Sequence, residues 1–249
     1  MSHRSFALLG SGEFEPWNEE VDRWLLGRAD GRDGRVLILP AASAPEGDEI
    51  FDGWATKGLV HFASLGIQAE VIPLKTQDDA DRPELASKLE GASVAFFSGG
   101  NPAYLVRILA GSRFWRALVE EMDRGLAYCG CSAGVACLGD VAPDSSLQDL
   151  TSPEIWQPGL GLFPKVYFGP HWDALNAYMP GLQALFVAAV PPDCRLLAID
   201  ENTAVVGDGT DWSVVGAGGA YYLDAGNWTE CKAGASFKAP LMTPEAAST

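Results

Sequence analysis

The chain has 249 residues, of which 47% are hydrophobic and 20% are charged, and this composition is typical of a folded protein with a sizeable core. The length fits one large α/β domain, so we treat residues 1–249 as a single domain. Seventeen Lys and Arg residues stand against 33 Asp and Glu residues, which gives a net charge of −16. A field of that sign repels phosphate backbones and anionic membranes, and it therefore argues against nucleic acid and membranes as partners.

No basic segment followed by an apolar one opens the chain, and no apolar run approaches the ~18 residues that span a membrane. The five cysteines are an odd number, and Cys129, Cys131 and Cys137 fall in the expected core. Free thiols in a reducing compartment explain this pattern better than disulfides, so we expect a cytoplasmic protein. Cys129 and Cys131 lack the spacing of zinc ligands, and we expect neither a metal nor a cofactor.

The first half of the chain alternates short apolar runs with longer segments of helical spacing. The predicted strands lie at 6–9, 36–39, 69–74, 94–97 and 126–129, and the predicted helices at 48–65, 82–89, 102–109 and 114–122. Apolar strands separated by helices indicate a parallel sheet covered on both faces. Ligands bind such sheets at the carboxyl ends of the strands, where two glycine-containing turns, at residues 99–101 and 130–134, are expected to share one site.

The pattern changes after about residue 140. Residues 140–164 contain four prolines and predict an irregular loop or flap. A further strand, a helical stretch and a series of hairpins follow, at 166–168, 175–190, 203–206, 213–215 and 220–223. The tail after Lys238 is expected to be frayed.

Residues 130–134 read Gly-Cys-Ser-Ala-Gly and lie between an apolar strand and a small-residue segment that can be helical. This is the setting of a nucleophile elbow, a strained turn that exposes the hydroxyl of Ser132. The flanking glycines are needed because a Cβ would clash with the neighbouring strand and helix. The N-terminus of the following helix favours negative charge that develops there. A glycine-rich turn with an incidental serine fits the same five letters.

A serine hydroxyl needs a base within hydrogen-bond reach. His171 follows a predicted strand and should lie at the same sheet edge as Ser132, whereas His3 lies in the terminal segment and His61 in a helical run. An acid must orient the imidazole, and Glu201 is favoured because it follows an apolar strand. Three other acids remain candidates for this role: Asp149, Asp173 and Asp200.

The turn after the fourth predicted strand offers backbone N–H groups that no side chain obstructs. We expect the N–H groups of Gly100 and Ala133 to form an oxyanion hole for a tetrahedral intermediate. Gly99, Asn101 and Cys131 are the expected lining of the substrate pocket. A tight strand-to-helix turn without catalytic purpose would demand glycine equally.

Five motifs in this order resemble those of the S51 serine peptidases, the family of aspartyl dipeptidase (peptidase E) and cyanophycinase. They lie at 97–101, 130–134, 159–164, 199–204 and 215–221. The resemblance implies a three-layer α/β sandwich like that of class I glutamine amidotransferases. Such a fold has a mainly parallel central sheet and C-terminal β-hairpins, with serine where those enzymes place cysteine.

The resemblance also implies that Ser132 is the nucleophile and His171 the base. Cyanophycinase-like members take their acid from the position that matches Glu201. Peptidase E takes an aspartate between serine and histidine, where Asp144 or Asp149 could stand in. Pro170 before His171 is closer to peptidase E than to cyanophycinase. The arginine that reads a substrate aspartate is not marked by context; its candidates are Arg107, Arg113 and Arg195.

The resemblance thus implies a serine-type peptidase or amidase that cleaves short peptides, with aspartyl or isoaspartyl peptides as the expected substrates. Two alternatives stay open. One is an esterase or other amidase that acts on a non-peptide acyl group, and the other is a non-catalytic binding protein that kept the fold. A small peptide is the expected partner, and a homodimer stays open.

Overall fold

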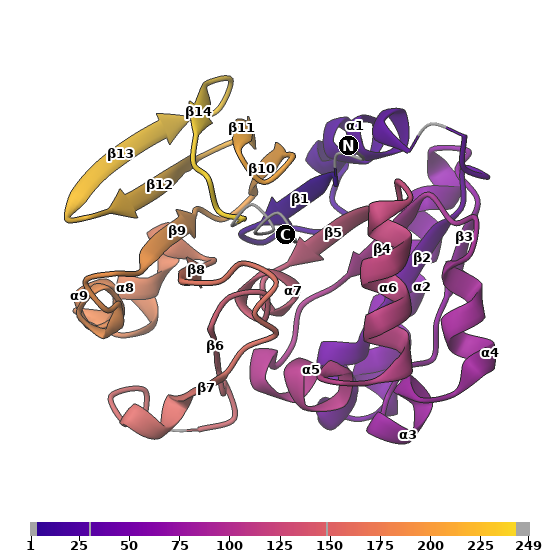
Figure 1. Cartoon of the computed structure of the whole chain (residues 1–249), viewed down its shortest axis with the longest axis horizontal. Coiled ribbons are helices and arrows are strands. Elements are labelled where there is room, and N and C mark those ends of the chain that lie inside the picture. Colours follow the sequence, from indigo (N-terminus) through magenta and orange to yellow (C-terminus); the bar gives the residue numbers. More distant parts are fainter. Residues whose placement is uncertain (1–3, 30, 148, 243–249) are drawn as a thin grey trace, which may run out of the picture.

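The computed structural model describes residues 4–29, 31–147 and 149–242, and its centre is an eight-stranded sheet (Figure 1). The strand order is β14-β11-β10-β1-β5-β4-β2-β3. These strands are β1 Phe6–Leu9, β2 Val36–Leu39, β3 Ala69–Val71, β4 Val94–Phe97, β5 Ala127–Cys131, β10 Thr203–Gly207, β11 Asp211–Gly216 and β14 Ser236–Lys238. Strands β1 to β5 pair in parallel, and β10, β11 and β14 extend the sheet antiparallel from β1.

A second sheet of four strands lies beside the first, in the order β13-β12-β9-β8. Its strands are β8 Val166–Gly169, β9 Arg195–Ile199, β12 Gly219–Asp224 and β13 Asn227–Lys232. Strands β8 and β9 run parallel, so their carboxyl ends share one edge. The predicted flap at residues 140–164 is not wholly irregular, because β6 Val141–Pro143 pairs with β7 Trp156–Pro158 within it.

Helices cover both faces of the central sheet (Figure 1). The α-helices are α1 Glu19–Arg28, α2 Asp48–Ser64, α3 Gln77–Ala80, α4 Pro83–Ala86, α5 Pro102–Leu109, α6 Arg113–Asp123, α7 Ala133–Ala136, α8 Leu175–Tyr178 and α9 Leu182–Ala189. Short 3-10 helices are η1 Pro16–Asn18, η2 Ala41–Glu46, η3 Ser87–Leu89, η4 Pro153–Ile155 and η5 Trp172–Ala174. Helix α5 begins as predicted, since Asn101 caps it by accepting the N–H of Tyr104 at 3.0 Å and Pro102 occupies its first turn.

Strand β1 shows how the layers arise. Its side chains alternate between two cores, because successive residues of a strand point to opposite faces. Phe6 and Leu8 join the core beneath α5 and α6, whereas Ala7 and Leu9 join the core beneath α1 and α2. The predicted three-layer α/β sandwich with a mainly parallel sheet is therefore confirmed.

Several elements differ from the sequence prediction. Helix α1 was not expected, because the buried Asp22 interrupts its apolar face. Strands β13 and β14 were also not expected. The prediction of a frayed tail is wrong for the residues directly after Lys238: Ala239 and Leu241 are fully buried, and the carbonyl of Ala239 accepts the indole N–H of Trp212 at 3.0 Å. Residues 243–249 lie outside the described part of the chain.

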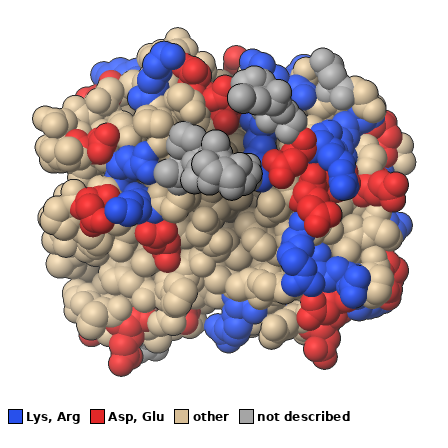
Figure 2. Space-filling model, viewed as in Figure 1, with Lys and Arg blue, Asp and Glu red and all other residues tan. Residues whose placement is uncertain are grey.

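All five cysteines are free thiols, in agreement with the sequence prediction. Across the described residues, no helix combines the length and the apolar character that crossing a membrane requires. On the face in Figure 2, Lys and Arg side chains lie among Asp and Glu side chains rather than forming a patch of one sign.

Candidate active site

Ser132 lies at the junction of β5 and α7, in a backbone conformation that residues other than glycine rarely adopt. Its φ of 50° and ψ of −104° give the strained turn of a nucleophile elbow. A Cβ on Gly130 would lie 2.2 Å from the carbonyl oxygen of Gly134, and a Cβ on Gly134 would lie 2.7 Å from that of Phe97. Both positions therefore need glycine, as the pattern predicts.

Ser132, His171 and Glu201 meet at the carboxyl ends of strands from the two sheets. His171 follows β8, and its Nε2 lies 2.8 Å from Oγ of Ser132. Glu201 follows β9, and its Oε1 lies 3.0 Å from Nδ1 of His171. A proton on Nδ1 donates to Glu201 and leaves Nε2 to accept the serine hydroxyl, which is the arrangement that general-base catalysis requires.

The loops that carry His171 and Glu201 are bonded to each other and to the central sheet. The backbone N–H of Glu201 donates to Oδ1 of Asp173, two residues past the histidine, at 2.8 Å. The next N–H, of Asn202, donates to Oγ of Ser11 beyond strand β1 at 3.1 Å. These bonds fix the distance between the imidazole and the carboxylate.

The other candidate acids have different partners. Asp173 holds the Glu201 loop, as described. Asp200 is buried, its Oδ2 accepts the N–H of Gly219 at 2.8 Å, and burial raises its pKa. Asp149 lies exposed in the flap, where it accepts bonds from Thr151. Among the acids of the described residues, Glu201 alone is hydrogen-bonded to His171.

Two backbone amides next to Ser132 are free to bind an oxyanion. Within the described part of the chain, the N–H groups of Gly100 and Ala133 donate to no protein acceptor. Gly100 has φ 140°, and a Cβ there would lie 2.3 Å from the backbone of Ala42, so only glycine fits. The neighbouring N–H of Asn101 donates to the carbonyl of Ala42 at 2.9 Å and holds this loop.

A cavity of about 680 Å³ opens beside Ser132, His171 and Gly100, all three of which line it. Its other walls come from α8, α9, the beginning of α5, the end of α7, and the flap. Ser132, His171 and Gly100 thus face a space large enough for a small substrate.

Comparison with known proteins identifies the family. The model of peptidase family S51 matches residues 6–215. The chain belongs to peptidase family S51. Cyanophycinase from Trichormus variabilis (strain ATCC 29413 / PCC 7937) is 25% identical over 229 residues, which cover 87% of this chain and 72% of the relative. As a member of this family, the protein is a hydrolase of the serine peptidase class.

Two solved structures share the S51 fold. A peptidase from an acI-B1 Actinobacterium superposes with a TM-score of 0.85 at 29% identity, covering 96% of this chain and 98% of that one. A putative peptidase E protein from Listeria monocytogenes EGD-e superposes with a TM-score of 0.60 at 18% identity, covering 86% and 98%. The second likeness is one of fold alone.

The buried carboxylate of Glu13 connects two segments of the site in this S51 peptidase. Glu13 is only 4% exposed, and its Oε1 accepts the N–H of Gly99 at 2.8 Å while its Oε2 accepts the thiol of Cys131 at 2.9 Å. It therefore ties the Gly100 loop to the residue before Ser132. Sequence reasoning missed this role, although Glu13 follows the turn after β1 and so lies at the same strand edge.

The expected pocket residues lie elsewhere. Gly99, Asn101 and Cys131 do not line the cavity. Cys131 is fully buried in the core on the α1 and α2 side, and burial raises the pKa of its thiol. Asn101 is turned to cap α5, and its Nδ2 donates to Asp144 at 2.7 Å. Cys131 as a pocket residue is a wrong prediction, because the tight turn at Ser132 separates the directions of neighbouring side chains.

Tyr178, at the end of α8, is a further side chain at the site that the sequence did not mark. Its ring meets that of His171 edge to face, with centroids 6.4 Å apart. Its hydroxyl lies 3.5 Å from Oε1 of Glu201, and the pKa of Tyr178 is raised by partial burial and then by this carboxylate. Tyr178 therefore lies against the contact between His171 and Glu201.

The other histidines are not part of this site. His3 lies outside the described residues. His61 is buried in α2, and its Nε2 lies 2.6 Å from Oδ2 of Asp22 in α1. The second oxygen of Asp22 accepts the side-chain amide of Asn18 at 3.0 Å. This pair joins two helices on one face of the sheet.

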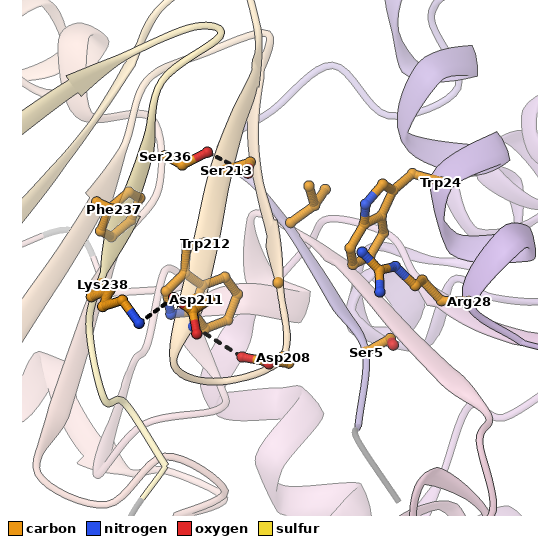
Figure 3. A pocket seen from close by; sticks show the side chains of 12 residues that line it. Ser5, Trp24, Arg28, Asp208, Asp211, Trp212, Ser213, Ser236, Phe237 and Lys238 are labelled. Carbon is orange, nitrogen blue, oxygen red and sulfur yellow. Dashed lines mark hydrogen bonds and ion pairs between the residues drawn. The ribbon is translucent and has the colours of Figure 1, made fainter.

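A second cavity, of about 590 Å³, lies between α1 and strands β10, β11 and β14 (Figure 3). Two charged side chains of its lining form an ion pair, with Nζ of Lys238 3.0 Å from Oδ1 of Asp211. The guanidinium of Arg28 lies over the ring of Trp24, 5.0 Å from the ring centroid. Among the described residues that line it, there is no histidine and no cysteine.

Proposed function

We propose that this S51 peptidase cleaves short peptides, or closely related amides, through an acyl-enzyme formed on Ser132. The observation that carries the proposal is the hydrogen-bond chain from Ser132 Oγ to His171 Nε2, 2.8 Å, and from His171 Nδ1 to Glu201 Oε1, 3.0 Å. The strained backbone of Ser132 supports the same assignment, as do the N–H groups of Gly100 and Ala133, which donate to no acceptor among the described residues.

In this mechanism Ser132 Oγ attacks the scissile carbonyl carbon while Nε2 of His171 takes the hydroxyl proton. The carbonyl oxygen becomes an oxyanion that accepts the N–H groups of Gly100 and Ala133. Imidazolium then gives its proton to the leaving amine as the C–N bond breaks. Water, deprotonated by His171, then attacks the remaining ester, and the imidazolium returns that proton to Oγ of Ser132 as the ester C–O bond breaks and the acid leaves. Glu201 stays ionised and stabilises the imidazolium throughout.

Aspartyl or isoaspartyl specificity, which the family resemblance suggested, would need a cation close to the scissile bond. No Lys or Arg stands among the described residues that line the cavity, so that expectation gains no support from the site. An ester would be cleaved by the same steps, and it belongs in the test.

The test compares wild type with Ser132→Ala on α- and β-aspartyl dipeptides, neutral and apolar dipeptides and simple esters, with products read by mass spectrometry. We expect hydrolysis by wild type alone, and equal melting temperatures for the two proteins. Full activity in Ser132→Ala would overturn the proposal. Tight binding of a peptide that wild type leaves intact would instead favour a binding protein.

A further inference from the structure

The cavity beside Ser132 is apolar on nearly all sides. Besides Tyr178, seven large apolar side chains of the described residues form its walls: Leu150, Ile155, Trp156, Leu175, Leu182, Leu185 and Phe186. Phe186 is held between Trp156 and Trp172, with ring centroids 4.9 Å and 6.1 Å apart and edge-to-face geometry. Such a wall keeps its shape when an apolar group binds.

Charge is missing from this lining. No Asp, Glu, Lys or Arg contributes to it within the described residues, and its polar groups are hydroxyls, the indole of Trp156 and the imidazole of His171. The charges nearest the reacting atoms are acidic, since Glu201 contacts His171 and Asp173 contacts the backbone of Glu201. A substrate carboxylate in this cavity would lose water, gain no counter-ion and meet like charge.

The arginines that could have read a substrate aspartate are all engaged elsewhere. The guanidinium of Arg107 stacks over the ring of Tyr104 at 5.2 Å. Arg113 lines a different depression, next to α4, and Arg195 donates to the carbonyl oxygens of Pro164 and Pro240. None of the three lines the cavity.

We propose that this cavity selects a substrate with an uncharged apolar side chain, such as Leu or Phe, next to the scissile bond. The inference rests on the proposed function, because it places that side chain beside the carbonyl that Ser132 attacks. Burial of a Leu or Phe side chain corresponds to a preference of about ten- to a hundredfold in kcat/KM over Asp.

The first experiment measures kcat/KM for matched dipeptides in which Leu, Phe, Asn, Asp or isoaspartate occupies each side of the scissile bond. Wild type should favour Leu or Phe over Asp by at least about tenfold on one side. Faster cleavage of Asp or isoaspartyl peptides would overturn the proposal and leave the serine mechanism intact.

Calorimetry of the same peptides on Ser132→Ala separates the cavity from the chemistry. Tighter binding of the Leu and Phe peptides supports the proposed apolar selectivity of the cavity, even if wild type cleaves none of them. Failure of wild type to cleave any of these peptides would contradict the proposed function alone. Equal or tighter binding of the Asp peptides would overturn the cavity proposal.

A charge placed in the wall provides the matched variant. Leu185 lines the cavity and is 44% exposed, while Leu59, on α2 and outside the cavity, is 40% exposed. Arginine fits either position without burial of its charge. Leu185→Arg should move the Leu-to-Asp ratio of kcat/KM about tenfold or more towards Asp, whereas Leu59→Arg should leave it unchanged. Equal ratios in both variants would show that substrate does not occupy this cavity.

Discussion

Glu13 provides a sharp test of how the site is held together, because it touches the catalytic loops but not the cavity. In Glu13→Ala the N–H of Gly99 loses its acceptor, and so does the thiol of Cys131. We therefore expect the loop that carries Gly100 to lose its anchor, and with it the placement of the N–H group that we propose binds the oxyanion.

The magnitude follows from the bonds that are lost. An amide that donates to a carboxylate contributes about 1.5–3 kcal/mol, and a thiol is a weaker donor. Glu13→Ala should thus lower the free energy of unfolding by about 1–3 kcal/mol. Complete loss of an oxyanion donor costs about 10²–10³ in rate, so kcat should fall by up to that factor. KM should change little, since Glu13 does not line the cavity.

Glu121 is the matched control. It is 8% exposed against 4% for Glu13, and it accepts hydrogen bonds from Arg32 at 2.7 Å and Arg124 at 2.6 Å. Glu121→Ala should reduce stability comparably in urea unfolding and leave kcat near that of wild type. Glu13→Gln should recover part of kcat, because its amide oxygen can still accept from Gly99. If Glu13→Ala and Glu121→Ala have the same kcat, Glu13 does not position the oxyanion loop.

Two further predictions concern charge. Glu201→Gln should lower kcat by roughly 10²–10⁴-fold with little change in melting temperature, because a neutral glutamine does not stabilise the imidazolium. A kcat within about threefold of wild type would count against Glu201 as the orienting acid. Burial raises the pKa of Asp22 above its ordinary 3.8, so the folded state holds this proton more tightly than the unfolded state. Protonated Asp22 contributes its full stabilisation below pH 3.8, and this stabilisation is lost as pH rises through the raised pKa of Asp22 in the folded state. Compared with Asp22→Asn, wild type should lose unfolding free energy as pH rises from about 4 to 7 in urea titrations, and a pH-independent difference would refute this.

The parts of the structure that follow from local pattern were predictable. Strand β1 and its partners are short apolar runs, and the turn at Ser132 needs glycines because a Cβ on Gly130 would lie 2.2 Å from the carbonyl oxygen of Gly134. Their position in a parallel sheet places the ends of β4 and β5 at one edge. This reasoning was enough to bring Ser132 and His171 to the same region, without any knowledge of side-chain contacts.

What the sequence could not predict depends on partners far apart in the chain. Asp22 obscured α1 in the sequence, because its burial depends on a hydrogen bond to His61, 39 residues away. The role of Glu13 was not predicted from the sequence, because its partners Gly99 and Cys131 lie 86 and 118 residues away. The C-terminal hairpins could not be assigned to a sheet, since β10 and β11 join the central one and β12 joins the other.

Chemistry and selectivity therefore have separate origins in this fold. The turns after β1, β4, β5, β8 and β9 carry Glu13, Gly100, Ser132, His171 and Glu201, and all of them lie within the segment that matches the S51 family. The apolar walls come from the flap and from α8 and α9, which lie in the same matched segment but are short elements between the strands that carry the proposed reacting groups. Loops and short helices at the edge of a rigid sheet can change their side chains without moving Ser132 or His171. Family membership thus predicts how the carbonyl is attacked, while the side chain beside it must be inferred from the walls of the cavity.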